Sequence, residues 1–142
     1  MNKDTLKILL IEDDDIDIMS IKRTLKKKNI VNELVVAKDG IEALDILRGT
    51  NDVEKISPPK IILLDLNMPR MNGLEFLEEI RNDKILQSSI VFVLTTSNSD
   101  EDKCNAYKKN IAGYILKSNI NNQFMEAITM LNLYWKIVEF PE

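Results

Sequence analysis

Residues 61–65 read Ile61-Ile62-Leu63-Leu64-Asp65, four consecutive aliphatic residues followed by an acid. Such a run is typical of a strand covered on both faces, because a strand with one wet face alternates apolar and polar residues. Similar short runs recur along the chain, at residues 6–11, 34–37, 90–94 and 114–116. Five such runs at wide intervals predict a parallel sheet whose connections cross both of its faces.

The segments between these strands have helical periodicity. Apolar residues repeat at spacings of three and four in two of them, at Ile18, Ile21 and Leu25 and at Leu74, Leu77 and Ile80. A third predicted helix, Ile41–Leu47, follows the turn pair Asp39-Gly40 and ends before Gly49. Alternating strands and helices predict a doubly wound α/β fold, and 142 residues are the length of a single domain, which we place at residues 1–142.

Composition excludes several classes of protein. Hydrophobic residues make up 44% of the chain and charged residues 30%, which is the balance of a globular domain. The net charge is −4 and the basic residues are scattered, so we expect no nucleic-acid partner. No apolar stretch is long enough to span a bilayer, and the single Cys104 cannot form an internal disulfide, so we expect a cytoplasmic protein without a membrane partner. The absence of histidine excludes histidine-based catalysis by this chain.

Polar residues follow the predicted strands at the edge where ligands bind in open parallel sheets. They are Glu12, Asp13 and Asp14 after the first strand, Asp65 and Asn67 after the third, Thr95, Thr96 and Ser97 after the fourth, and Lys117 after the fifth. Carboxylates that converge from two neighbouring strands repel each other and require a cation. Oxygen ligands without histidine or cysteine favour Mg²⁺ or Mn²⁺ over zinc.

The other groups at this edge indicate what the metal is for. Lys117 and a hydroxyl such as that of Thr95 would supply donors that, together with the metal, match the three equatorial oxygens of a phosphoryl group. Asp65 is then the nucleophile, because a carboxylate can accept phosphoryl as a mixed anhydride. Glycine-rich phosphate loops are absent, so nucleotide and flavin binding are disfavoured.

Four motifs in this order resemble the receiver domain of two-component response regulators. They are residues 8–14 (ILLIEDD), 63–73 (LLDLNMPRMNG), 94–96 (LTT) and 113–117 (GYILK). The resemblance implies a flavodoxin-like sheet with strand order 2-1-3-4-5. The long loop before the third strand and the segment Tyr134–Val138 look most like stand-alone receivers related to the cyanobacterial phytochrome response regulator.

The resemblance also implies a role for each site residue. Asp65 would be phosphorylated, Asp13 and Asp65 would bind the metal with Glu12 in its outer shell, and Asn67 would offer its backbone carbonyl. Thr95 and Lys117 would contact phosphoryl oxygens, Tyr114 would be the aromatic switch that follows Thr95, and Asn67 and Ser97 resemble positions that tune dephosphorylation. A sensor histidine kinase or a phosphotransfer protein would be the donor. The chain would be a signalling protein and not an enzyme, beyond its own phosphotransfer and dephosphorylation.

Two alternatives stay open. A phosphatase of the haloacid dehalogenase type needs a second aspartate two residues after the nucleophile, and this sequence has Asn67 there. A receiver-like scaffold that no longer uses phosphate is kept open by Lys117-Ser118, which replaces the family's Lys-Pro. A cis bond before Ser118 would cost about 2.5–4 kcal/mol, so this loop is expected to aim Lys117 less rigidly.

Output must come through protein contacts, since only Pro141 and Glu142 follow the last predicted helix and we expect no output domain. The fourth helix, around Glu101–Asn110, has few apolar residues and is predicted to be thinly anchored. The last helix has two apolar faces. One is a core stripe that should face the sheet, made of Phe124, Ile128, Leu131, Trp135 and Val138. The second lies mostly on the opposite side and consists of Met130, Leu133, Tyr134, Ile137 and Phe140. This second face predicts a homodimer through the fourth helix, fifth strand and fifth helix.

Overall fold

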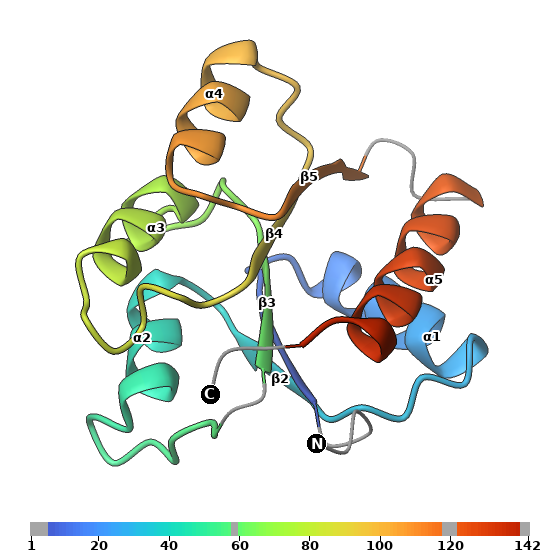
Figure 1. Cartoon of the computed structure of the whole chain (residues 1–142), viewed down its shortest axis with the longest axis horizontal. Coiled ribbons are helices and arrows are strands. Elements are labelled where there is room, and N and C mark those ends of the chain that lie inside the picture. The colour runs from blue at the N-terminus through green and yellow to red at the C-terminus, as the bar shows by residue number, and fades with distance from the viewer. Residues whose placement is uncertain (1–5, 58–59, 118–121, 140–142) are drawn as a thin grey trace.

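The computed structural model describes residues 6–57, 60–117 and 122–139 (Figure 1). A parallel sheet has the strand order β2-β1-β3-β4-β5, which confirms the predicted fold. Its strands are β1 (Lys7–Ile11), β2 (Leu34–Ala37), β3 (Lys60–Leu64), β4 (Val91–Thr95) and β5 (Gly113–Leu116). Each predicted strand lies within one residue of the observed bounds. The parallel register pairs Ile11 with both Ala37 and Leu64, so the carboxyl ends of the first three strands are level.

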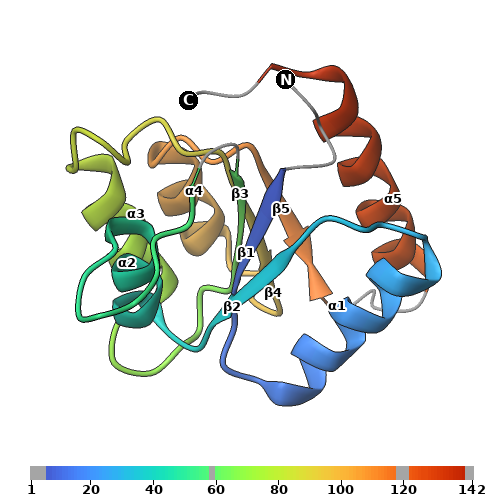
Figure 2. The ribbon, with the colours of Figure 1, turned by 90° about the horizontal axis from the view of Figure 1, so that it is seen from below.

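In the part of the chain that the structure describes, five helices cover the sheet in two layers. Figure 2 shows α1 and α5 on one face of the sheet, and α2, α3 and α4 on the other. Their bounds are α1 (Asp15–Lys27), α2 (Gly40–Arg48), α3 (Gly73–Arg81), α4 (Asp100–Lys108) and α5 (Asn122–Ile137). Within the described ranges, no helix combines the length and the apolar character that crossing a bilayer requires.

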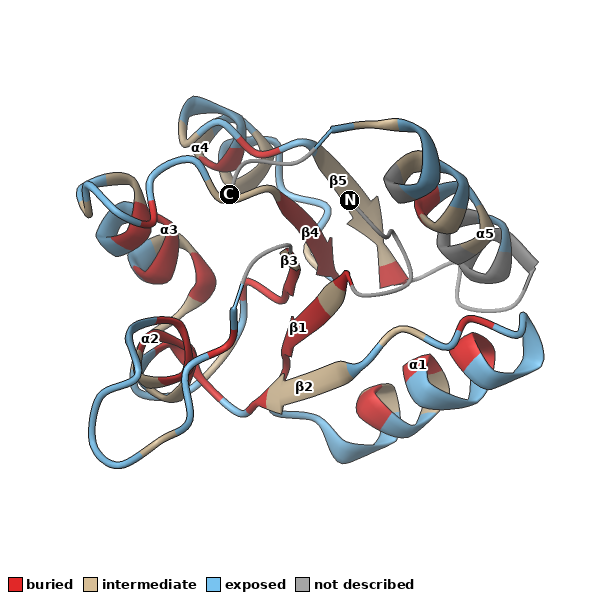
Figure 3. Cartoon of the chain, turned by 60° about the horizontal axis from the view of Figure 1, so that its bottom comes forward, coloured by how far each residue is buried: buried red, intermediate tan, exposed pale blue. Residues whose placement is uncertain are grey.

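Burial follows the position of each strand in the sheet. All five residues of β4 are buried, and β1 and β3 are buried after their first residue, whereas the edge strands β2 and β5 are mostly half-buried (Figure 3). Side chains alternate between two cores, one on each face of the sheet. Continuous aliphatic runs therefore mark the strands that have helices on both sides.

Side-chain caps determine where several helices begin, because the first backbone amides of a helix lack partners within it. The residues whose side chains accept these amides are Asp14 before α1, Asp39 before α2, Asn72 before α3 and Ser99 before α4. At Asn72 the cap is reciprocal, since Glu75 accepts the Asn72 amide in return. Gly49 ends α2 in the left-handed conformation, at φ 70°.

Helix α4 is thinly anchored, as the sequence predicts. Ala106 is its one buried residue, while Cys104 and Tyr107 are exposed. The chain after its C-terminal end is held by Arg81 of α3, whose guanidinium donates to the carbonyl oxygens of Lys109 at 2.6 Å and Asn110 at 3.0 Å. The helix therefore depends on contacts at its ends more than on a buried face.

Helix α5 confirms part of its predicted stripe and corrects one residue. Leu131 is buried, and Val138 packs against the same core. Tyr134 was predicted on the outer face, but its ring makes an edge-to-face contact with Phe92, with centroids 5.4 Å apart. The reason is geometric: a residue three positions after Leu131 lies on the same side of a helix.

Several predicted features of the C-terminal region lie outside what the structure describes. They are the side chains of Phe124, Ile128 and Trp135, the residue Phe140, and the bond between Lys117 and Ser118. On the outer face of α5, the side chains of Met130, Leu133 and Ile137 are exposed, as predicted.

Candidate functional site

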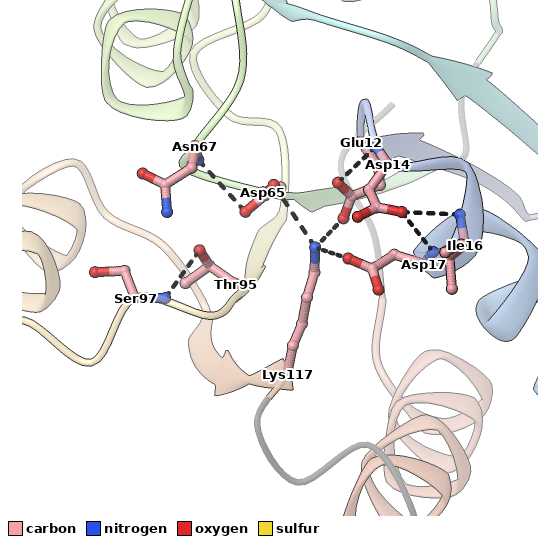
Figure 4. Close-up of polar contacts among 9 residues, drawn as sticks. All are labelled: Glu12, Asp14, Ile16, Asp17, Asp65, Asn67, Thr95, Ser97 and Lys117. Atoms are coloured by element: carbon pink, nitrogen blue, oxygen red, sulfur yellow. Dashed lines mark hydrogen bonds and ion pairs between the residues drawn. The ribbon is translucent and has the colours of Figure 1, made fainter.

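The predicted site residues gather at the carboxyl edge of the sheet (Figure 4). Glu12 follows β1, Asp65 follows β3, Thr95 ends β4, and Lys117 follows β5. They come together because parallel strands deliver their carboxyl ends to one edge. Asp14 does not join them, since its carboxylate accepts the amides of Ile16 and Asp17 as the cap of α1.

Glu12, Asp13 and Asp65 form an acidic cluster. One carboxylate oxygen of each lies within 4.8 Å of the others. Glu12 and Asp65 are buried and Asp13 is exposed, so the cluster has a closed inner side and an open outer side. Oxygen ligands at this spacing fit a hard divalent cation such as Mg²⁺. Asn67 lies beside the cluster, and its backbone amide donates to Asp65 Oδ1 at 3.4 Å.

Burial dominates the electrostatics of Glu12. Loss of solvent, with a smaller contribution from the negative charge of Asp65, outweighs the opposing contacts and raises the pKa of its carboxyl to about 7. The hydrogen bond from Lys117 acts in the opposite direction, which keeps the pKa of Glu12 from rising further. The inner acid of the cluster is therefore poised to ionise when a cation offsets its charge.

Lys117 supplies the cation in this part of the site. Its ammonium contacts Glu12, lies 2.9 Å from Asp17 Oδ2 and 3.6 Å from Asp65 Oδ2. Burial alone would lower the pKa of Lys117, but its hydrogen bonds to Glu12 and Asp17 and the nearby carboxylates outweigh burial and raise it. The side chain is only 4% exposed, so this charge is held inside the protein.

Asp17 was missed by the sequence reasoning. It lies in the first turn of α1, where the helix dipole favours any acid. Asp15 lies in the same turn but points to Lys38 instead. The acidic character of the turn is a signal in the sequence, but only the structure shows which of the two acids faces Lys117.

A chain of hydrogen bonds links Thr95 to α4. The Ser97 amide donates to the buried Thr95 hydroxyl at 3.4 Å, and the Ser97 hydroxyl donates to Asp102 Oδ2 at 2.6 Å. Tyr114 is half-buried, and its hydroxyl donates to the Ser97 carbonyl oxygen at 2.9 Å. The two predicted switch residues, Thr95 and Tyr114, therefore meet at Ser97. Thr96, by contrast, is exposed.

The outer side of the acidic cluster opens into a cleft of about 400 Å³. Its lining includes Asp13, Asn67, Met68, Pro69, Asn72 and Asp102. The start of α3 can lie close to Asp65 only because residue 73 is glycine, since a Cβ there would lie 2.6 Å from the Asp65 carbonyl oxygen. The loop between β3 and α3 is also tied to α2, since Arg70 donates to Asp39 at 2.7 Å.

A family model of the response regulator receiver domain matches residues 8–129. The chain belongs to this family. Response regulator Rcp1 of Synechocystis sp. (strain ATCC 27184 / PCC 6803 / Kazusa) is 33% identical over 128 residues, which are 90% of this chain and 87% of Rcp1.

Two solved structures extend the comparison. The crystal structure of the phosphorylated cyanobacterial phytochrome response regulator RcpA matches with a TM-score of 0.87 and 34% identity, over 97% of this chain and 99% of RcpA. The crystal structure of the Mn²⁺-bound form of Rcp1 matches with a TM-score of 0.85 and 31% identity, over 97% and 99% of the two chains. The resemblance drawn from the sequence is therefore confirmed: this is a receiver-domain response regulator, a signalling protein of two-component systems.

Proposed function

We propose that the protein is a single-domain response regulator, with residues 1–142 forming one receiver domain, that accepts a phosphoryl group on Asp65. The observation that carries the proposal is the convergence of three carboxylates within 4.8 Å of one another, with the Lys117 ammonium 3.6 Å from Asp65. The donor would be a sensor histidine kinase or a phosphotransfer protein. A basic nucleic-acid surface is not expected at a net charge of −4.

Asp13, Asp65 and the Asn67 backbone carbonyl would hold Mg²⁺ or Mn²⁺, with Glu12 in the outer shell. The all-oxygen donor set supports this assignment. When bound, the metal would supply positive charge that offsets the acidic cluster and the incoming phosphoryl oxygens. It would also favour the ionised form of Glu12, whose pKa is about 7 without it.

In the transfer step, a carboxylate oxygen of Asp65 attacks the phosphorus atom of a phosphohistidine. The new oxygen–phosphorus bond forms as the phosphorus–nitrogen bond breaks, and the leaving histidine nitrogen keeps the electron pair of that bond. Lys117 and Thr95 would contact phosphoryl oxygens, because one is a buried cation and the other a buried hydroxyl at the same edge. No general acid of the phosphatase type stands two residues after Asp65, where the residue is Asn67.

The response to phosphorylation would pass through Thr95 and Tyr114. Movement of the Thr95 hydroxyl toward a phosphoryl oxygen would break its contact with the Ser97 amide, and Tyr114 is bonded to the same residue. Output would be a protein contact on α4, β5 and α5. The exposed apolar side chains of Met130, Leu133 and Ile137 support a homodimer that uses α5. A cytoplasmic location is part of this proposal.

The test is intact mass spectrometry after incubation with acetyl phosphate and Mg²⁺. The wild-type protein should gain one phosphoryl group, and neither Asp65→Asn nor a sample with excess chelator should gain it. A matched control is Asp45→Asn, since Asp45 lies on α2 and contacts Thr50 and Asn51 instead of the site. Equal mass gain in Asp65→Asn would show that another residue is the acceptor. No gain in the wild type would favour the scaffold alternative.

A further inference from the structure

Asp17 is an acid for which the proposed phosphoryl transfer has no role so far. Its side chain is 20% exposed, and its Oδ2 lies 2.9 Å from the ammonium of Lys117. Within the described ranges, the acids close enough to share a cation are Glu12, Asp13 and Asp65, and Asp17 is not among them. Its contact is therefore with the lysine of the site and not with the metal cluster.

The Lys117 ammonium has three hydrogen-bond donors and three acidic neighbours. Two neighbours, Glu12 and Asp17, accept hydrogen bonds, and Asp65 lies at 3.6 Å. Figure 4 shows the ammonium between Asp65 on one side and Glu12 and Asp17 on the other. A lysine ammonium ends a flexible stem and lacks the fixed fork of arginine. Its orientation therefore depends on these partners.

Asp17 is itself firmly placed. The Asp14 carboxylate caps α1 and accepts the Asp17 amide at 3.3 Å, and Ile18 and Ile21 bury the helix against the sheet. The backbone of Lys117 follows directly on β5, whereas its long side chain is oriented by its contacts with Glu12 and Asp17. Helix α1 offers a rigid support for one of these contacts.

We propose that Asp17 is a positioning residue for phosphoryl transfer. Together with Glu12 it occupies two of the three N–H donors of Lys117, so that the third points to the oxygens of the phosphoryl group on Asp65. This inference rests on the function proposed above. A donor held in place before the reaction needs no reorganisation during it, whereas a misplaced one costs rate.

Asp15 provides a matched control. It is the other acid of the first turn of α1, its side chain is 81% exposed, and it contacts Lys38. Asp15→Asn removes the same charge from the same helix end without touching Lys117. A favourable interaction with the helix dipole would be lost in both variants, whereas the lysine contact would be lost only in variants of Asp17.

The first measurement is the rate of phosphorylation by acetyl phosphate at saturating Mg²⁺, followed by intact mass. We expect Asp17→Ala to react about tenfold more slowly than the wild type, because the donor loses its orientation. Asp17→Asn should react about threefold more slowly, since an amide oxygen still accepts a weaker hydrogen bond. Asp15→Asn should stay within about twofold of the wild type. Faster reaction of Asp17→Asn would overturn the proposal, because Asp17 would then act only by repelling the anionic donor.

The second measurement is the ¹⁵N NMR signal of the Lys117 ammonium, without any phosphate donor. Asp17→Ala should broaden or shift this signal, and Asp15→Asn should leave it unchanged. Urea unfolding of each variant verifies that it is folded. An unchanged signal together with an unchanged rate in Asp17→Ala refutes the positioning role alone. A wild type that gains no phosphate refutes the proposed function, while the ammonium signal still decides whether Asp17 orients the lysine.

Discussion

Substitution of Gly73 by alanine should damage both stability and the phosphoacceptor strand end. Gly73 is the first residue of α3, and its backbone amide donates to the carbonyl oxygen of Leu66, the residue after Asp65, at 2.9 Å. A Cβ at position 73 would lie 2.6 Å from the Asp65 carbonyl oxygen and 2.7 Å from the Leu66 Cα. Both distances are much shorter than an ordinary van der Waals contact of 3.4–4 Å. Because both atoms belong to the backbone, neither can rotate out of the way.

The expected cost is the difference between two terms. Overpacking a well-packed site costs about 1–3 kcal/mol. Alanine recovers about 0.5–1 kcal/mol, since it loses less backbone freedom on folding than glycine does. Because the atoms that meet the Cβ belong to the backbone, overpacking should cost about 2–3 kcal/mol here. The free energy of unfolding of Gly73→Ala should therefore fall by about 1–2.5 kcal/mol, which lowers Tm by about 3–8 °C for a domain of this size. The rate of phosphorylation should fall as well, because the backbone of Asp65 and Leu66 would have to shift to make room for the Cβ.

Gly113→Ala is the matched control. Its Cβ would meet side-chain atoms of Phe92 at 3.1 Å, and a ring can shift where a backbone cannot. Urea unfolding of both variants should show the larger loss for Gly73→Ala, with an unchanged m-value. If Gly73→Ala unfolded at the same urea concentration as the wild type, or cost less than Gly113→Ala, the close approach of α3 to the strand end would not constrain this position.

Without metal, the free energy of unfolding should fall as pH rises from about 4.5 to 7, because folded Glu12, with a pKa of about 7, keeps a proton that the unfolded chain releases. Urea titrations of Glu12→Gln should lack this fall; the same slope in both proteins would exclude Glu12 as its source. Thr95→Ala and Lys117→Ala should still bind Mg²⁺, yet the NMR shift of Tyr114 on adding beryllofluoride should fade, and an undiminished shift would argue against the switch. Ile137→Lys should lower self-association in light scattering across a concentration series, whereas a monomeric wild type with or without beryllofluoride would reject the homodimer.

The sheet could be predicted because its central strands consist almost entirely of aliphatic residues. Burial on both faces requires this composition, and Ile61–Leu64 shows it most clearly. The end of β4 was less visible. Thr95 belongs to the strand and pairs with Leu116, although its hydroxyl lies among the proposed site residues. A polar residue at a strand end is thus predicted as loop from the sequence, although its backbone still pairs with the neighbouring strand.

The contact partners of individual residues at the start of a helix could not be predicted in the same way. Acids occupy positions 12–15 and 17, and the structure gives them different partners: Asp14 caps α1, Asp15 contacts Lys38, and Asp17 contacts Lys117. The direction in which each of these side chains points depends on the angle at which α1 follows β1, and the spacing of apolar residues does not give that angle. Tyr134 illustrates the same limit on α5, because it lies near the border between the two apolar faces of one helix.

The two sides of the site differ in how firmly they are held, and this difference is what a switch requires. On one side, Glu12 and Lys117 are buried together against β1, β3 and α1, so displacing them would expose paired charges. On the other side, α4 buries only Ala106, and its first turn is joined to Thr95 through Ser97 and Asp102. A phosphoryl group that attracts the Thr95 hydroxyl would act on the α4 side, where movement breaks the fewest contacts. The same chemistry placed beside α1 would have to displace a helix held by four buried residues, Ile18, Ile21, Thr24 and Leu25, so movement there would cost more than movement of α4.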